Sequence, residues 1–262
     1  DHRLLLPPSA GPVAGRALEA RPPITVSTPF LSVIVCTRNR AAFLEPCLES
    51  ALRQSYPRDR YEIIVVDNGS TDGTAALCRD FESRGVRHVL EPVIGLSRAR
   101  NTGWREARGT YVGYLDDDAT ADEGWLAAVA ESVDLTEGRA DWIGGAIYLK
   151  WEAPAPVWMN EELQVPLGYV FWGDQPRRLT PTERLGGGNS FYPRQRLLEL
   201  GGFDERLGRQ GGNLLSGEET QLQKRIEREG GFLFYHPRAC IHHHVAAERG
   251  RAGWFCRRYF WG

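Results

Sequence analysis

Apolar strand patterns alternate with helical patterns through the first half of the chain, and this alternation limits the fold more than any other feature. The strand patterns cover residues 31–36 and 62–66, with a weaker one at 86–90. Nearly continuous β-branched runs of this kind are typical of strands buried in a parallel sheet. The alternation therefore predicts an α/β fold, with a mostly parallel, doubly wound sheet of Rossmann-like character and helices on both faces.

Polar residues stand where these strand patterns end. Asn39, Asp67 and Asp116 each lie at or just after such an end. In doubly wound sheets, ligands bind beyond the carboxyl ends of the strands, so we expect the three side chains to converge on one crevice. The chain has no G-x-G-x-x-G after its first strand and no G-x-x-x-x-G-K-[ST], which disfavours a dinucleotide-binding fold and a P-loop.

Residues 109–119 form a short apolar strand pattern that runs directly into Asp116, Asp117 and Asp118. Three adjacent acids repel one another and are costly to desolvate without a cation. Alternation along an extended chain sends Asp116 and Asp118 to one side and Asp117 to the other. Two carboxylates on one side suit a hard divalent ion that keeps open positions for phosphate oxygens. A solvated acidic turn is the alternative for an isolated triplet.

Composition and length describe an ordinary globular protein. The 262 residues are 42% hydrophobic and carry a formal net charge of −2, so we expect no nucleic-acid partner. No apolar run approaches the length of about 18 residues needed for a membrane span. The five cysteines include no C-x-x-C pair, which favours free thiols in a reducing compartment and predicts a cytoplasmic protein.

The chain divides into a tail and one domain. Residues 1–29 are rich in Pro, Ala and Arg and are expected to form a tail or linker, followed by a single domain over residues 30–262. Within it, residues 151–182 are irregular and contain several Trp and Pro residues; a loop of this length is more often a functional lid than filler. Glycines at 186–188 enter a strand pattern, which indicates either close approach of backbone to a ligand or a β-bulge.

Two acids and three histidines stand out in the last quarter of the chain. Glu218 and Glu219 open a predicted helix, where the helix dipole alone would stabilise them by about 0.3–1 kcal/mol. Adjacent helical side chains diverge by about 100°, so we expect only one of the two to point into the crevice. In an extended chain His243 faces away from His242 and His244; ligand and structural roles are both open.

The C-terminal segment, residues 254–261, is aromatic and basic. One interpretation is an interfacial helix that makes peripheral contact with a membrane. The other is a C-terminal helix packed on the core.

Five short motifs follow one another in a characteristic order. They are residues 33–40 (VIVCTRNR), 65–74 (VVDNGSTDGT), 99–103 (ARNTG), 114–118 (YLDDD) and 216–219 (SGEE). As a set they resemble the family-2 glycosyltransferases, inverting nucleotide-sugar enzymes with the GT-A fold. The resemblance covers about residues 30–260, and it implies a nucleotide-binding half at 30–120 and an acceptor-binding half at 121–262.

The resemblance implies a nucleotide-sugar site built from several parts of the chain. Asp67 meets the edge of the base, Arg100 and Asn101 lie under the nucleotide, and Gly188 and Asn189 contact the donor sugar. The full set of implied nucleotide-sugar-binding residues is Thr37, Arg38, Asn39, Arg40, Asp67, Asn68, Arg100, Asn101, Asp116, Asp117, Gly188 and Asn189.

The resemblance also implies a metal site. Asp116 and Asp118 match the family's D-x-D motif, with Asp118 on Mg²⁺ or Mn²⁺ and Asp116 near the ribose or phosphate as well as the ion. A histidine near the C-terminal end of such domains often completes the metal shell, which implicates His243 or His244.

Sugar transfer needs a metal and a base for general chemical reasons. A sugar diphosphate leaves as an anion, which a divalent ion stabilises, and an acceptor hydroxyl needs a carboxylate to take its proton. The resemblance places Glu219 at the usual base; the family commonly has Glu-Asp here, so Glu218 stays as the alternative. We therefore predict a metal-dependent, inverting hexosyltransferase that uses a UDP-sugar and a carbohydrate, lipid-linked or natural-product acceptor.

Two other functions were weighed. A nucleotidyltransferase also combines an α/β sheet with metal-binding acids, but it would want a glycine-rich loop after the first strand, and residues 37–40 contain no glycine. An inactive carbohydrate-binding domain, recognising sugars through its tryptophans, is the other alternative.

Overall fold

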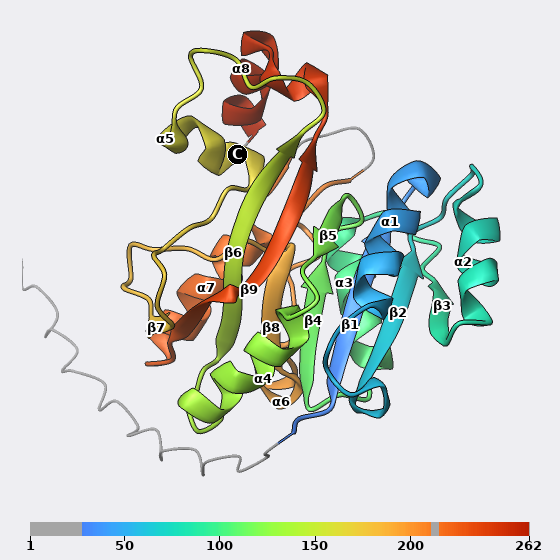
Figure 1. Ribbon diagram of the computed structural model, residues 1–262, viewed down its shortest axis with the longest axis vertical. Coiled ribbons are helices and arrows are strands. Elements are labelled where there is room, and N and C mark those ends of the chain that lie inside the picture. The colour runs from blue at the N-terminus through green and yellow to red at the C-terminus, as the bar shows by residue number, and fades with distance from the viewer. Residues whose placement is uncertain (1–27, 211–214, 262) are drawn as a thin grey trace, which may run out of the picture.

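A nine-stranded sheet runs through the centre of the computed structural model, with helices on both of its faces (Figure 1). The structure describes residues 28–210 and 215–261, so the predicted tail at 1–29 lies outside the described residues except for its last two. The strands are β1 (Leu31–Thr37), β2 (Tyr61–Asp67), β3 (Val86–Leu90), β4 (Tyr111–Leu115), β5 (Ala119–Ala121), β6 (Trp142–Trp151), β7 (Arg177–Arg178), β8 (Asn189–Pro193) and β9 (Leu233–Val245).

Helices connect most of these strands. The α-helices are α1 (Ala41–Leu52), α2 (Thr74–Glu82), α3 (Leu96–Glu106), α4 (Trp125–Leu135), α5 (Glu161–Gln164), α6 (Arg194–Leu200), α7 (Glu218–Arg228) and α8 (Ala252–Trp261). Short 3₁₀ turns are η1 (Arg58–Arg60), η2 (Val165–Leu167) and η3 (Ala247–Gly250).

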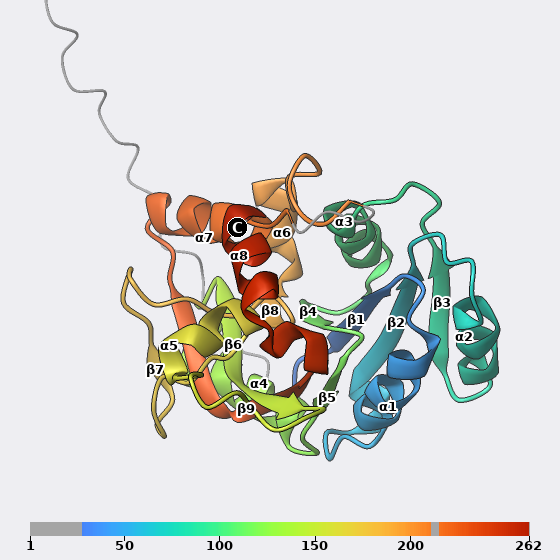
Figure 2. The same cartoon turned by 90° about the horizontal axis from the view of Figure 1, so that it is seen from above.

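The first four long strands form a parallel half-sheet in the order β3-β2-β1-β4. Their apolar side chains point alternately to the two faces, and each face is covered by its own set of helices. Helices α1, α2 and α4 pack on one face, and α3, α6 and α7 on the other (Figure 2). The predicted α/β fold with helices on both faces is confirmed.

The second half of the sheet is mixed. Strand β8 lies between β4 and β6 and is antiparallel to both, β9 runs parallel to β6, and β5 pairs antiparallel with β9 at the edge. Because β8 is antiparallel to β4, the beginning of β8 lies beside the end of β4, with Asn189 opposite Leu115. The loop at 186–188 is therefore brought directly to the triple-aspartate turn.

A cap covers the carboxyl ends of the strands. It consists of the segment that carries α5 and η2 together with helix α8, which lie together at the top of Figure 1. Phe255 of α8 is buried with Leu167 and Val245, so α8 packs on the protein, as one of the two interpretations proposed. Tyr259 and Phe260 of the same helix are 62% and 81% exposed. Among the described residues no helix is long and apolar enough to cross a membrane.

Candidate active site

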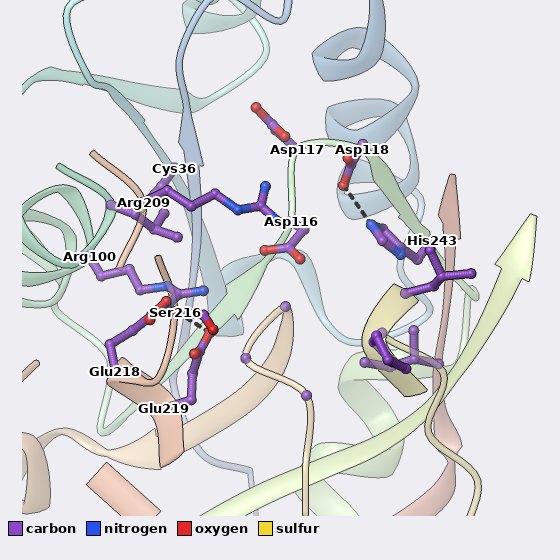
Figure 3. Close-up of a pocket in the computed structure, with 18 of the residues that line it drawn as sticks. Cys36, Arg100, Asp116, Asp117, Asp118, Arg209, Ser216, Glu218, Glu219 and His243 are labelled. Carbon is purple, nitrogen blue, oxygen red and sulfur yellow. Dashed lines mark hydrogen bonds and ion pairs between the residues drawn. The ribbon is translucent and has the colours of Figure 1, made fainter. Parts of the chain in front are cut away.

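A cavity of about 510 Å³ opens beyond the carboxyl ends of β1 and β4, under the cap (Figure 3). It brings together side chains from many separated parts of the chain. The predicted site residues that line it are Thr37, Arg38, Arg40, Asn68, Arg100, Asp116, Asp117, Asp118, Gly188, Glu218, Glu219 and His243. A crevice therefore lies beyond the strand ends, as expected, and most of the predicted residues face it. Of the three side chains expected to converge there, however, only Asp116 lines the cavity, whereas Asn39 and Asp67 do not.

The three aspartates have different partners. Asp117 accepts a hydrogen bond from the Thr37 hydroxyl at 2.7 Å, which ties the turn to the end of β1. Asp118 faces His243 Nε2 at 3.2 Å and two guanidinium groups, Arg40 at 3.3 Å and Arg249 at 3.5 Å. Asp117 and Asp118 thus have different partners, but they lie in a turn rather than in the extended chain assumed from the sequence, and both line the cavity.

The surroundings of the turn shift the pKa values of Asp117 and Asp118 in opposite directions. Burial and the neighbouring Asp118 raise the pKa of Asp117 to about 7. Burial also acts on Asp118, but the bond with His243 and the charges of Arg40 and Arg249 outweigh it and hold the pKa of Asp118 below its ordinary value. Asp118 is therefore the ionised carboxylate of the pair at neutral pH.

Asp116, Asp118 and His243 can hold a divalent ion. One ligand atom from each of the three lies within 4.8 Å of the other two. Two carboxylates and an imidazole are a donor set that suits Mn²⁺ and that Mg²⁺ also accepts through the oxygens. Among the described residues, Nδ1 of His243 is buried without a hydrogen-bond partner. The residues present thus fit the ion that the family resemblance implies.

Only one of the histidines takes part in this cluster. The ring of His244 packs against Phe43 with the centroids 5.0 Å apart, so it lies outside the group that could share an ion. His242 points to Asp122 instead, at 3.0 Å. The ligand role that the sequence left open between His243 and His244 fits His243.

The second charged group of the cavity is a buried arginine with two glutamates. Arg100 on α3 is 3% exposed, and its Nη1 lies 2.8 Å from Oε1 of Glu218 and 2.8 Å from Oε1 of Glu219 (Figure 3). Both glutamates line the cavity, so the expectation that only one would point inward is wrong. The reason is that both side chains bend from the first turn of α7 toward the same guanidinium.

Glycines make room for both clusters. A Cβ at Gly187 would lie 1.9 Å from Oε1 of Glu219, and one at Gly188 would lie 2.2 Å from Oδ2 of Asp116. The backbone of this loop therefore lies against both clusters, at positions where no larger residue fits. The close approach observed is to these two side chains, and the predicted approach to a ligand stays a prediction.

Comparison with known proteins identifies the family. The sequence model of glycosyl transferase family 2 matches residues 32–191, more than half of the chain. The chain belongs to this family. The prediction of a GT-A glycosyltransferase is thereby confirmed, and the nucleotidyltransferase and binding-domain alternatives are set aside.

Two curated relatives align over most of this glycosyltransferase. The glucosyl-dolichyl phosphate glucuronosyltransferase of Haloferax volcanii is 28% identical over 88% of the chain and 74% of its own length. The succinoglycan biosynthesis protein ExoM of Rhizobium meliloti is 26% identical over 89% of the chain and 72% of its own length.

Solved structures share the fold. The mannosyltransferase PcManGT of Pyrobaculum calidifontis, in complex with GDP-Man and Mn²⁺, superposes with a TM-score of 0.63 at 22% identity. The match covers 93% of the present chain and 64% of that one. A complex of TarS from S. aureus with UDP-GlcNAc gives a TM-score of 0.62 at 19% identity, covering 82% of the present chain and 58% of that one.

Several predicted nucleotide-sugar-binding residues are engaged elsewhere in the glycosyltransferase. Asn189 is fully buried; it accepts a hydrogen bond from Trp125 Nε1 and donates to two backbone carbonyls. The Asn101 side chain donates a hydrogen bond to the carbonyl of Phe203 and accepts one from the amide of the same residue. Neither lines the cavity, so the expected contacts of these two amides with the donor do not fit the structure, because their hydrogen-bonding groups already hold the fold together.

In the loops after β1 and β2, too, predicted site residues make hydrogen bonds within the protein. Asn39 accepts from the Thr71 amide at 2.7 Å, and Asp67 accepts from the Ser70 amide at 2.9 Å. Neither side chain lines the cavity. Asn68 lines it, but its amide nitrogen donates to two carbonyls and its oxygen accepts from Gly95. These residues shape the loops that border the cavity.

Sequence reasoning missed the basic residues of the cavity wall. Arg209, Arg249 and Arg258 line it from segments that carry no recognisable motif. Arg249 lies in the turn η3 beyond the last strand, where its approach to Asp118 depends on how the cap folds back. The one signal in the sequence was the basic character of the C-terminal segment.

We expect Arg100→Ala to lower the free energy of unfolding at pH 7 by about 3–5 kcal/mol, because it leaves two carboxylates packed together without their cation. In this variant the carboxyl pKa values would lie above their unfolded values. The loss should therefore be largest at pH 8 and shrink as the pH falls toward 5 and the glutamates are protonated. Urea unfolding across this range measures the effect.

Arg105→Ala on the same helix is the matched control, since its guanidinium is exposed and contacts only the Trp104 ring among the interactions described. It should cost less than about 1 kcal/mol and show no such pH dependence. Equal losses in the two variants would contradict the structural importance of the Arg100 pair.

Proposed function

We propose that this glycosyltransferase transfers a sugar with inversion from a nucleoside diphosphate donor, UDP-linked, to an acceptor hydroxyl, and that it needs a divalent metal. The observation that carries the proposal is the arrangement of the cavity. A cluster fit for a metal ion, Asp116, Asp118 and His243, lies in the same cavity as the glutamates bound to Arg100 but apart from them (Figure 3). Gly188 lies against Asp116 and Gly187 lies against Glu219.

The donor diphosphate belongs at the aspartate cluster. Asp116, Asp118 and His243 would hold Mn²⁺ or Mg²⁺, and the bound ion would offset the charge of the departing diphosphate. Arg40 and Arg249 already contact Asp118 from the cavity wall, and guanidinium groups in this position are suited to hydrogen-bond phosphate oxygens. The mannosyltransferase neighbour contains Mn²⁺ together with its nucleotide sugar, which supports this assignment.

The nucleoside belongs beside the ends of β1 and β2. Thr37, Arg38 and Asn68 line this part of the cavity, and the Thr37–Asp117 hydrogen bond fixes its floor. The solved neighbours hold GDP-Man and UDP-GlcNAc. We propose a UDP donor for this chain on its resemblance to the family.

The acceptor hydroxyl belongs at the glutamates. Arg100 keeps the pKa of Glu219 below its ordinary value although burial acts to raise it, so this carboxylate is ionised at neutral pH. Burial and repulsion by Glu219 raise the pKa of Glu218 to about 7. The Glu219 side chain is 23% exposed against 3% for Glu218. We assign proton removal from the acceptor to Glu219, and to Arg100 the task of orienting it.

Attack from the glutamate side would reach the anomeric carbon opposite the diphosphate. Because the two charged clusters line one cavity at separate positions, an acceptor held at Glu219 and a leaving group held at Asp118 would flank one sugar. Displacement with this geometry inverts the anomeric configuration. A single base is enough, since the leaving diphosphate needs no proton when its charge is neutralised.

The cap offers a surface for a lipid-linked acceptor or a membrane. Val157, Trp158 and Val165 of the cap and Tyr259 and Phe260 of α8 are exposed apolar side chains. Exposed arginines at 251 and 257 flank them. An apolar patch with basic neighbours is suited to contact the headgroup region of an anionic bilayer. The name of the Haloferax relative refers to a dolichyl phosphate, which supports an acceptor of this class.

Asp118→Ala should abolish the tightening of nucleoside diphosphate binding by Mn²⁺, because it removes a carboxylate of the proposed metal cluster. Calorimetric titration of UDP and GDP, with and without Mn²⁺, measures this and also tests the choice of nucleotide. Asp80→Ala, at an exposed position of α2, is the control and should keep the metal response. An unchanged response in Asp118→Ala would refute the assignment.

Glu219→Gln should lower kcat by about two to four orders of magnitude, because glutamine keeps the shape of the side chain but cannot take a proton. Donor affinity should remain nearly unchanged. Glu218→Gln is the matched variant and should lose far less activity. Release of free nucleoside diphosphate from the donor is the readout. If Glu218→Gln is inactive while Glu219→Gln turns over normally, the two roles are reversed; if both remain active, the base lies elsewhere.

The double change Tyr259→Ser with Phe260→Ser should reduce co-sedimentation with vesicles that contain anionic lipid, since it removes the apolar part of the proposed contact. Leu135→Ser is the control, because Leu135 is 56% exposed on α4, away from the cap. Equal sedimentation of both variants and the unmodified protein would exclude this surface as the membrane contact.

A further inference from the structure

A second group of metal-ligand side chains lies on strand β9, on the face opposite to His243. Cys240 and His242 are two residues apart on this strand and so point to the same side of the sheet, whereas His243 points to the other. Strand β5 pairs with β9 so that Thr120 lies opposite His242 and Ala121 opposite Ile241. One step further, the Asp122 amide donates to the Cys240 carbonyl at 3.1 Å, which places Asp122 beside Cys240.

The side chains meet at distances close to those of a coordination sphere. His242 Nε2 lies 3.0 Å from Asp122 Oδ1 and 4.0 Å from Cys240 Sγ. One ligand atom from each of the three lies within 4.8 Å of the others. With metal–ligand bonds of about 2.0–2.3 Å, tetrahedral geometry separates ligand atoms by about 3.3–3.7 Å. Small side-chain rotations are enough to close the set around an ion.

We propose that Asp122, Cys240 and His242 form a second metal site, specific for a borderline cation such as Zn²⁺, with one coordination position open to solvent. The donor set decides the class of ion. A thiolate with an imidazole favours Zn²⁺ over the hard ions Mg²⁺ and Mn²⁺, which prefer oxygen ligands. The site therefore differs in chemistry from the cluster at Asp118.

An ion can enter this group from solvent. The side chains of His242 and Asp122 are 41% and 53% exposed, whereas Cys240 is 6% exposed at the base of the group. Burial and the nearby Asp122 raise the pKa of the Cys240 thiol to about 12, so the incoming ion must displace the thiol proton to solvent. The ring of Tyr148 lies 5.9 Å from that of His242 and limits how far the imidazole can rotate away.

An ion at this second site would influence the proposed metal cluster at Asp118 and His243 from the opposite face of the sheet. Strand β5 begins at Ala119, directly after Asp118, and β9 carries His243 between His242 and His244. An ion that joins Asp122 to Cys240 and His242 would fasten the edge strand β5 to β9. It would thereby fix the spacing between Asp118 and His243 without contacting either.

Titration of the chelator-treated protein with Co²⁺ tests the proposal. Tetrahedral Co²⁺ bound to a thiolate gives a near-ultraviolet charge-transfer band and strong visible absorption, and Zn²⁺ should bleach both. Cys240→Ser should remove the charge-transfer band, whereas Cys256→Ser, at an exposed cysteine of α8, should keep it. Asp118→Ala should keep it as well, because the cluster at Asp118 contains no thiol, so failure of the catalytic metal assignment is recognised separately.

Two further variants guard against a folding defect at the buried cysteine. His242→Asn and Asp122→Asn change exposed side chains and should each weaken Co²⁺ binding by about tenfold or more. Zn²⁺ should raise the Tm of the unmodified protein and not that of His242→Asn. The absence of a charge-transfer band, its persistence in Cys240→Ser, or Co²⁺ binding unaffected by His242→Asn would each overturn the proposal.

Discussion

The gathering of five carboxyl groups around one cavity is the constraint on which the rest of the site depends. The Asp116–Asp118 turn and the Glu218–Glu219 pair would repel one another strongly in a medium of low dielectric constant if no cations were near. Arg100 lies between the glutamates, and Arg40 and Arg249 lie against Asp118. Each arginine comes from a different part of the chain, so the balance of charge exists only once the fold is complete. The same arrangement shifts the pKa values of the carboxyl groups in different directions.

The antiparallel strand β8 brings the glycine loop that precedes it against both groups of carboxylates. Because β8 starts where β4 ends, the loop before it crosses the cavity at the level of Asp116. Gly187 and Gly188 let the backbone approach Glu219 and Asp116 at distances that exclude a side chain. In the proposed reaction the donor phosphate and the acceptor hydroxyl would be held at these two separate groups of carboxylates. The parallel half-sheet alone would supply only the aspartate side.

The features of the site that depend on local sequence periodicity could be predicted from the sequence. The features that depend on the pairing of distant segments could not. The strand runs and the position of Asp116 beside the end of β1 follow from periodicity and from the sheet rule. The same rule wrongly placed Asn39 and Asp67 in the cavity, because their side chains bond within their own loops. The direction of β8 depends on pairing across many residues and leaves no periodic signal. Sequence position also cannot tell a ligand-binding amide from a structural one, as Asn101 and Asn189 show. Asn101 lies in the 99–103 motif and Asn189 follows the glycines at 186–188, yet both amides donate hydrogen bonds to backbone groups of distant segments.

The alternation of side chains along strand β9 contributes residues to two clusters, one on each face of the sheet. Its alternation sends His243 into the cavity toward Asp118 and leaves His242 on the opposite face beside Asp122 and Cys240. Asp118 and Asp122, the partners of His243 and His242, directly precede and follow the short strand β5 (Ala119–Ala121), which pairs with β9. Any change that shifts β5 along β9 therefore moves Asp118 relative to His243 and Asp122 relative to His242 together. The register of these two strands, rather than any one side chain, sets the position of Asp118 relative to His243. This is why an ion on the outer face would affect the proposed metal cluster on the inner one.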